Sequence, residues 1–323
     1  MSRHFIRITK EKTYGGDPVD TPTAGTDQIY IDYGTTPPGV RRNLVVWNHQ
    51  SVVPSRGLTN RLTGSDQYQV SGSLQTLLFH EQAAFWKTAV FEPTVDPVTK
   101  RESLPSYTID QAILSNNSVK WTDRFKGCVF TQATIQGSNE GSRAPIQLSV
   151  NVIGSERVEV PVSPAFDPAS CADLPDKPYR WSKSQIMLNS VDLKDLLRNY
   201  TLTINHQVAQ RINMGQHVTA VMHTGWSPSL QATIDLDDWT YKTKHFDLLT
   251  SFQAARYATG NTIKFTDPVS GGDTTFTLHN VIVSAFGENL PVADFFTAGV
   301  TLMPFYDCTN LDMTCAYTAT GTP

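Results

Sequence analysis

The chain contains the same series of short segments twice, at a separation of roughly half its length. Asn48–Gln50 recurs as Asn205–Gln207, and Lys87–Phe91 as Lys242–Phe246. Other matched segments follow in the same order: Gln28–Asp32 with Gln185–Asn189, Ser73–Gln75 with Ser229–Gln231, Lys126–Phe130 with His279–Val283, and Leu148–Val150 with Val300–Leu302. Collinear matches at nearly constant spacing predict a tandem duplication of a whole domain, because solenoid repeats are only a few tens of residues long.

A length of 323 residues accommodates two domains of ordinary size, each able to bury its own core. The matched segments place a first domain at 1–157 and a second at 179–306. Residues 158–178 are rich in proline and poor in periodicity, which is typical of a linker. Residues 307–323 carry many threonines and little apolar content, so we expect a C-terminal arm there.

Short runs with the period of half-buried strands dominate both copies. In the first copy they are Asp27–Tyr33, Asn43–Gln50, Tyr68–Leu78, Cys128–Gln136 and Pro145–Ile153, and in the second Gln185–Asn189, Tyr200–His206, Ser229–Asp235, Thr274–Ser284 and Thr297–Met303. One helix interrupts the strands of each copy, at His80–Phe91 and at Asp237–Ala258. The predicted fold is therefore mainly β, with two tandem β-sandwich or barrel domains that each carry one flanking α-helix.

The charge balance restricts the partners of the chain. A net charge of −4 gives no basic excess to neutralise a phosphate backbone, so tight nucleic-acid binding is disfavoured. No stretch of about 18 uncharged apolar residues occurs, and the first residues lack the apolar segment of a signal peptide. We expect a protein that is made in the cytoplasm and does not engage a membrane.

The sequence carries no recognisable catalytic motif: it has no P-loop, dinucleotide turn, nucleophile elbow or zinc-protease helix. Of the acids Asp235, Asp237 and Asp238, Asp235 is expected to end a strand, and Asp237 and Asp238 are best explained as the start and cap of the predicted second helix. His49 and His206, which the duplication matches, lack a duplicated partner and favour a structural role. We therefore expect no enzyme, no catalytic residue, no cofactor and no metal site.

The cysteines are Cys128, Cys171, Cys308 and Cys315, and their spacing fits no zinc signature. Free buried thiols are the favoured interpretation. A short disulfide between Cys308 and Cys315 remains the alternative in an oxidising setting.

The order of segments resembles that of the tail tube proteins of long-tailed bacteriophages. An N-terminal segment ending at Glu11–Gly15 precedes the Gln28–Asp32 strand, a paired strand and a long loop. A strand containing Ser71–Leu74, a helix and two closing strands follow, and the pattern returns from Trp181 to Phe305. Simple members of that family carry one tube domain per chain and form hexameric rings, whereas this chain carries two.

The resemblance implies a structural virion protein that polymerises into stacked rings, forming the hollow tail tube through which phage DNA passes without tight binding. Two domains per chain imply trimeric rings with pseudo-six-fold symmetry. Implied partners are further copies, the tail terminator, the tape measure and the distal tail protein. Ser51–Gln69 and Val208–Trp226 are expected to be loops that reach the neighbouring ring, with contact residues Arg56, Arg61, Arg211 and His217.

Three alternatives stay open. A distal-tail or baseplate adaptor shares the tube fold and differs in copy number. A two-domain β-sandwich that binds carbohydrate or protein is typical of tandem β modules, and exposed aromatic clusters would favour it. A hydrolase with paired carboxylates would draw on acids such as Glu81, Asp110, Asp235 and Glu288, which no spacing favours.

Overall fold

The computed structural model of the chain describes residues 2–32, 40–49, 62–99, 101–115, 118–139, 144–159, 177–188, 190–193, 196–212, 218–235, 256–257, 259–289, 297–305 and 312–318. Antiparallel strands make up most of these residues. The prediction of a mainly β fold is confirmed.

The first half of the chain supplies β1 (Ser2–Lys10), β2 (Gln28–Asp32), β3 (Val40–His49), β4 (Leu62–Leu77), β5 (Thr94–Val95), β6 (Glu102–Ser103), β7 (Tyr107–Ser115), β8 (Ser118–Ser138), β9 (Gln147–Gly154) and β10 (Glu156–Glu159). The second half supplies β11 (Ser184–Leu188), β12 (Val191–Asp192), β13 (Leu197–Ile212), β14 (Val218–Asp235), β15 (Arg256–Tyr257), β16 (Thr262–Thr266), β17 (Asp273–Leu278), β18 (Val281–Asn289), β19 (Thr297–Met303) and β20 (Met313–Thr318).

The helix predicted at 80–91 is present as three consecutive turns. A 3-10 turn (His80–Gln82) leads into α1 (Ala83–Trp86), and a π-helical turn (Lys87–Phe91) ends it. The second predicted helix, Asp237–Ala258, lies outside the described residues except for Arg256 and Tyr257. Those two residues form β15, so the helix prediction is wrong there. A further 3-10 turn, Trp181–Lys183, precedes β11.

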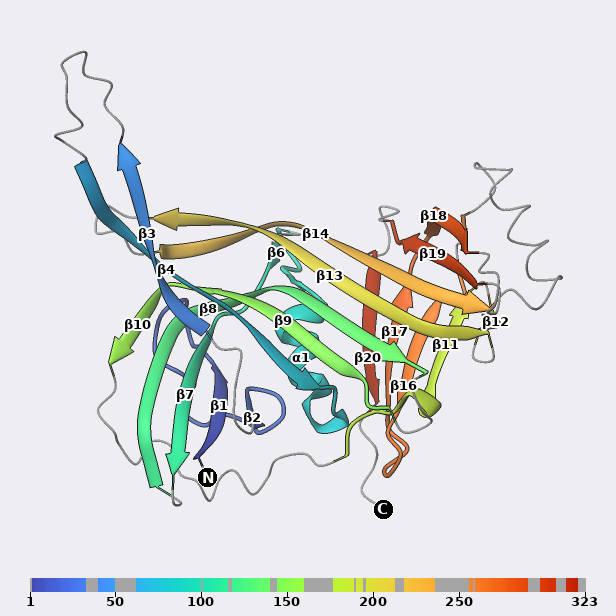
Figure 1. Cartoon of the computed structure of the whole chain (residues 1–323), viewed down its shortest axis with the longest axis horizontal. Coiled ribbons are helices and arrows are strands. Elements are labelled where there is room, and N and C mark those ends of the chain that lie inside the picture. Colours follow the sequence, from blue (N-terminus) through green and yellow to red (C-terminus); the bar gives the residue numbers. More distant parts are fainter. Residues whose placement is uncertain are drawn as a thin grey trace, which may run out of the picture.

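The same order of strand neighbours occurs in both halves (Figure 1). The first half pairs β2 with β1, β1 with β7, and β7 with the first part of β8, which also pairs with β10. The second half pairs β12 with β11, β11 with β16, β16 with β17, and β17 with β20. A second series, β3-β4-β9-β8, is matched by β13-β14-β19-β18.

Irregularities in the ladders fix which residues of the long strands correspond. Asp66 is an extra residue on β4 opposite Val45 and Val46, and Thr224 is the extra residue at the matching place on β14. Thus β13 follows β3 at an offset of 162 (Val45 to Gln207), and β14 follows β4 at 158. β-Bulges are inherited features rather than accidents, so they make reliable markers of correspondence.

The last two strands of each series carry a second matched bulge. Thr131 is the extra residue on β8 and Ser284 the extra residue on β18, an offset of 153. Their hydroxyl groups donate to the carbonyls of Asn151 and Thr301, respectively, which places β19 at an offset of 150 from β9. Gly127 and Asn280, also 153 apart, both adopt positive φ.

These offsets correct the sequence matches. His49 corresponds to Arg211 and not to His206, because β13 is displaced by 162 positions and not by 157. β11 occupies the place of β1 and not of β2, since it pairs with β16 as β1 pairs with β7. The connecting segments of the two halves differ in length, so the offset between corresponding strands changes from one strand to the next. Matching identical short segments therefore pairs residues that do not correspond in the fold.

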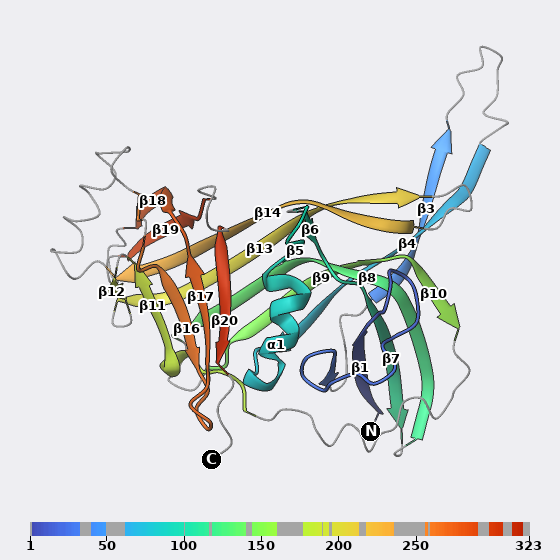
Figure 2. The ribbon, with the colours of Figure 1, turned by 180° about the vertical axis from the view of Figure 1, so that it is seen from behind.

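One hydrophobic core serves both halves. The helical segment around α1 lies under the long sheet, between the β1-β7 strands and the β16-β17-β20 strands (Figures 1 and 2). Trp86 packs on Phe130 of β8, and Phe91 packs on Phe276 of β17 with ring centroids 5.0 Å apart. The halves therefore do not bury separate cores. The predicted domain boundaries stay a prediction. β10 continues to Glu159, and the predicted arm is wrong where it is described, because Met313–Thr318 forms β20 and pairs with β17.

Candidate assembly interface

A strand pair joins the two halves into one sheet. β13 pairs with the second part of β8 from Asn199 opposite Ser138 to Asn205 opposite Gln132. Ile204 and Ile135 lie on the core side and are fully buried. On the other face, the Gln132 amide donates to Asn205 Oδ1 at 2.7 Å and accepts from the Asn151 amide. The β3-β4-β9-β8 series thus continues directly into β13-β14-β19-β18.

A second contact between the halves lies at the far end of the β13-β14 ribbon. The Ser155 hydroxyl donates to the Val218 carbonyl at 2.6 Å, and Val218 is buried. The Ser155 N–H donates to the carbonyl of Lys126. Because Phe305 N–H donates in the same way to His279, Phe305 occupies the place of Ser155 in the second half.

Two strand edges of the combined sheet have no partner among the described residues. β3 pairs only with β4 there, although its counterpart β13 pairs on both sides. β18 pairs with β19, and β15 covers only Val281 and Ile282 on its other side. At the internal junction, β8 supplies this neighbour to β13, and β13 supplies it to β8. Because β18 is the counterpart of β8 and β3 is the counterpart of β13, the two open edges are complementary to each other. Open edges of this kind favour association with another chain.

Exposed apolar side chains accompany the β18 edge. Phe305 is 42% exposed and Met303 on β19 is 39% exposed. Their counterparts in the first half are Ser155 and Ile153, and Ser155 contacts Val218 near the tip of the β13-β14 ribbon. An exposed phenylalanine at a place that is covered in the other half marks a contact surface.

The face of the sheet opposite the core is polar and uncharged in its central registers. Alternate residues of β4, β8, β9, β13, β14 and β19 supply it: Ser73, Gln75, Gln132, Thr134, Ser149, Asn151, Thr201, Thr203, Asn205, Ser229, Gln231, Thr233 and Thr301. Charge enters at the margin, where Arg198 Nε binds Asp235 at 2.5 Å. The Asp235 carboxylate therefore serves an ion pair at the end of β14, where the sequence predicts that a strand ends, and Asp237 and Asp238 lie outside the described residues.

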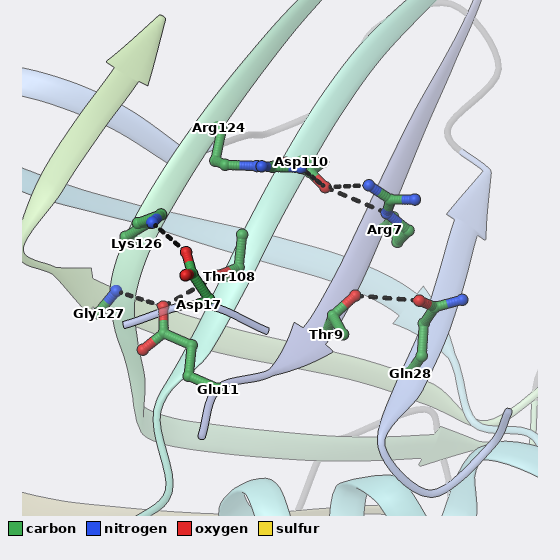
Figure 3. A network of polar contacts seen from close by, with 10 residues as sticks. All are labelled: Arg7, Thr9, Glu11, Asp17, Gln28, Thr108, Asp110, Arg124, Lys126 and Gly127. Atoms are coloured by element: carbon green, nitrogen blue, oxygen red, sulfur yellow. Dashed lines mark hydrogen bonds and ion pairs between the residues drawn. The ribbon is translucent and has the colours of Figure 1, made fainter. Parts of the chain in front are cut away.

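The outer strands of the first half are held by buried charges (Figure 3). Asp110 of β7 is 3% exposed and binds Arg7 of β1 and Arg124 of β8, with closest contacts of 2.5 and 2.7 Å. The hydrogen bond to Asp110 raises the pKa of Arg124. Glu11, also buried, accepts from the backbone N–H groups of Gly15 and Gly127. These carboxylates are saturated by donors, as structural groups are.

A histidine pair links the β13-β14 ribbon to the helical segment and to β6. His206 Nε2 donates to the Val90 carbonyl at 2.7 Å, so neutral His206 offers its Nδ1 lone pair to His223 Nε2 at 3.1 Å. His223 Nδ1 lies 3.2 Å from Glu102. Burial, with His223 nearby, lowers the pKa of His206 to about 4, and burial also lowers the pKa of His223.

This burial of neutral His206 predicts a loss of stability in acid. His206 binds a proton near pH 6.5 in the unfolded chain and near pH 4 in the folded chain. The contribution of neutral His206 to the free energy of unfolding is therefore fully present above pH 6.5 and is lost as the pH falls from 6.5 to 4. We expect a loss of about 3 kcal/mol. Urea unfolding of wild type and His206→Gln at pH 7.5 and 4.5 tests this, and an equally steep fall in both proteins would contradict it.

Most of the predicted inter-ring contact residues lie outside the part of the chain that the structure describes. Arg56, Arg61 and His217 lie outside the described residues, and Arg211 is exposed near the end of β13. The predicted loops are wrong where they are described: Leu62–Gln69 belongs to β4, and the residues 208–212 and 218–226 extend β13 and β14. The apolar residues in these ends do not alternate regularly with polar ones, so the strand signal is weak, and the ladder hydrogen bonds override it.

Within the described ranges, no group of three or more histidines, cysteines or acids is placed to hold a metal ion. No helix there is long and apolar enough to span a membrane. Cys128 and Cys315 are buried free thiols, and burial raises the pKa of both. Cys308 lies outside the described residues.

Comparison with known proteins shows to which family the chain belongs. A solved structure titled "Virion of native gene transfer agent (GTA) particle" contains a similar chain, with 9% identity and a TM-score of 0.29 over 42% of this chain and 95% of that one. No curated protein matches the sequence. The family model for phage tail tube proteins matches residues 1–303. The chain therefore belongs to the phage tail tube protein family.

Proposed function

We propose that three copies of this chain close into a ring by pairing β18 of each copy with β3 of the next, and that the rings stack into the tail tube. One observation carries the proposal. The internal β8-β13 junction is a head-to-tail strand pair between matched halves, and the open edges β18 and β3 are the counterparts of its two members.

Head-to-tail contacts generate closed rings when the rotation between units closes. The internal junction supplies one such rotation, and the junction between chains repeats it with corresponding strands. Members with one domain form rings of six, so three chains with two copies of the strand series each fill the same positions. The ring then has three-fold symmetry and pseudo-six-fold architecture.

The uncharged polar face of the sheet lines the channel. Its core side is covered by the helical segment and the aromatic cluster, which leaves the hydroxyl and amide side chains for the lumen. Such a lining keeps its hydration and offers the DNA phosphates neither ion pairs nor strong repulsion, so DNA passes without tight binding. The acidic balance of the chain resides elsewhere than in these central registers.

The virion tail is the site of action, and the role is mechanical, without catalysis. The partners are further copies of the chain, the tail terminator, the tape measure and the distal tail protein, and synthesis takes place in the host cytoplasm. The ends of the β3-β4 and β13-β14 ribbons reach the next ring, with Arg56, Arg61, Arg211 and His217 as contacts. A distal adaptor of the same fold would differ by its low copy number in the virion.

The mass of the smallest closed assembly tests the stoichiometry. Native mass spectrometry of the concentrated protein is expected to show a species of three chains of 35.8 kDa each, about 107 kDa. Larger species should be multiples of that mass. A closed ring of six whole chains as the smallest unit would overturn the trimer and leave the family assignment intact.

A further inference from the structure

The β13-β14 ribbon carries opposite charges at its two ends. It runs along the long sheet from a place beside β3 and β4 to a place beside β12 (Figures 1 and 2). Arg211 lies at the first end, opposite Ala220, and Asp235 lies at the second end, opposite Thr297. The register places both side chains on the face of the sheet opposite the core. The length of β14 between these registers separates the two charges by about 45 Å.

The Arg211 end of the ribbon is a fixed, exposed surface. β8 pairs with β13 only as far as Asn205, and β19 pairs with β14 only from Leu230, so the ribbon extends beyond both neighbours. Its core side is held on the same chain by the contact of His206 with Val90. On its other side Arg211 is exposed, and so is Met222 at 61%. Arg211 is the one lysine, arginine or acid among the described residues 206–212 and 218–229, so this end is cationic.

The Asp235 end offers a carboxylate that is already ordered. Asp235 Oδ1 binds Arg198 Nε at 2.5 Å, and 28% of the Asp235 side chain is exposed. Asp110 binds both Arg7 and Arg124, so one carboxylate of this chain holds two guanidinium groups. A carboxylate has two oxygens and accepts several hydrogen bonds from arginine. Asp235 therefore has the capacity to bind a second arginine from outside the chain.

The segments beside the two ends carry the same bias of charge in the sequence. The connections 50–61, between β3 and β4, and 213–217, between β13 and β14, contain two arginines and no acid. At the other end, Asp192 of β12 is exposed. The connections 236–255 and 290–296, which follow β14 and β18, contain four acids and two lysines: Asp237, Asp238, Asp247, Asp294, Lys242 and Lys244.

Opposite charges at opposite ends of one ribbon favour a head-to-tail contact between copies. We propose that Arg211 of each chain binds Asp235 of a chain in the next ring, an inference that rests on the proposed stacking of rings. A ring added upside down would bring like charges together, which opposes its docking. The contact thus sets the polarity of the tube. It also limits the rise from ring to ring to about 50 Å, the length of the ribbon between the two charges plus one ion pair.

A double-mutant cycle on the full-length protein tests the pair. Arg211→Gln alone and Asp235→Asn alone are each expected to raise the concentration at which rings stack into tubes about tenfold, because three exposed pairs of about twofold each act together between two rings. The double variant should lie within about twofold of either single variant. Substitutions about 45 Å apart in one chain have additive effects, so this lack of additivity can arise only between chains. Arg101→Gln, at an exposed turn, should stack as wild type does.

Sedimentation and electron microscopy measure stacking, and native mass spectrometry measures ring closure separately. Single variants that stack at the wild-type concentration, effects that multiply in the double variant, or a rise well above about 50 Å would overturn the contact and leave the ring intact. Wild-type rings that never stack would overturn it too. If Asp235→Asn fails to fold by circular dichroism, Arg198→Gln with Asp235→Asn replaces it, since that variant leaves no arginine without its partner. A wild-type chain that forms no rings would instead contradict the proposed function.

Discussion

Replacing Asp110 with alanine is expected to lower the free energy of unfolding by about 3–5 kcal/mol. The carboxylate is 3% exposed and accepts from both Arg7 and Arg124, whose side chains are 17% and 22% exposed. Its removal takes away the carboxylate that both guanidinium groups bind across β1, β7 and β8. Urea unfolding measures the loss, which is a large share of the stability of an ordinary domain.

The control for Asp110 is an ion pair in water. Lys12 binds Asp20 at 2.7 Å, but the Asp20 side chain is 82% exposed, so Asp20→Ala should cost under about 0.5 kcal/mol. The second half offers a rescue, because Met187, Thr262 and Thr277 occupy the registers of the triad. Introducing those three residues together at the triad should restore most of the stability. A loss below about 1 kcal/mol in Asp110→Ala would refute the structural role.

Replacing Phe305 with aspartate is expected to reduce ring formation about 30-fold or more, the effect of losing an aromatic anchor worth at least about 2 kcal/mol. Phe305 is 42% exposed in the single chain, and its counterpart Ser155 contacts the ribbon of the other half. In the proposed ring, the β3-β4 ribbon of the next chain would cover it. A charged side chain at that place would be buried without a partner.

Val98→Asp provides the matched comparison, since Val98 is 86% exposed in the turn between β5 and β6, away from both open edges. Sedimentation of both variants and wild type at equal concentration measures the assembled fraction. Phe305→Asp rings at the wild-type level would show that Phe305 lies outside the contact between chains.

Sequence reasoning identified the strand content, the helical segment at 80–91 and the duplication, because each depends on local periodicity or on order along the chain. It misplaced the correspondence of individual residues. Asn48–Gln50 and Asn205–Gln207 are nearly identical, yet the ladder places His49 opposite Leu62 and His206 opposite Trp226, at different points of the matched ribbons. The register of a strand is set by its hydrogen bonds to the neighbouring strands, and a slip of one residue moves every side chain to the opposite face of the sheet.

The candidate interface could not be predicted from the sequence, because it also depends on the register of the strands. Phe305 is an ordinary residue until the offset of its strand is known. The shared core also escaped prediction, because the contact between Phe91 and Phe276 joins residues of different halves that no local pattern connects. The extended ribbon ends were predicted as loops, since their small and polar residues carry little of the apolar alternation that marks a half-buried strand.

A cryo-electron microscopy reconstruction of assembled tubes is the decisive measurement for ring closure. We predict three-fold rings with one continuous inner sheet, in which β8-β13 junctions within chains alternate with β18-β3 junctions between chains. A ring of six whole chains, or chains joined through any strand edges other than β18 and β3, would contradict it.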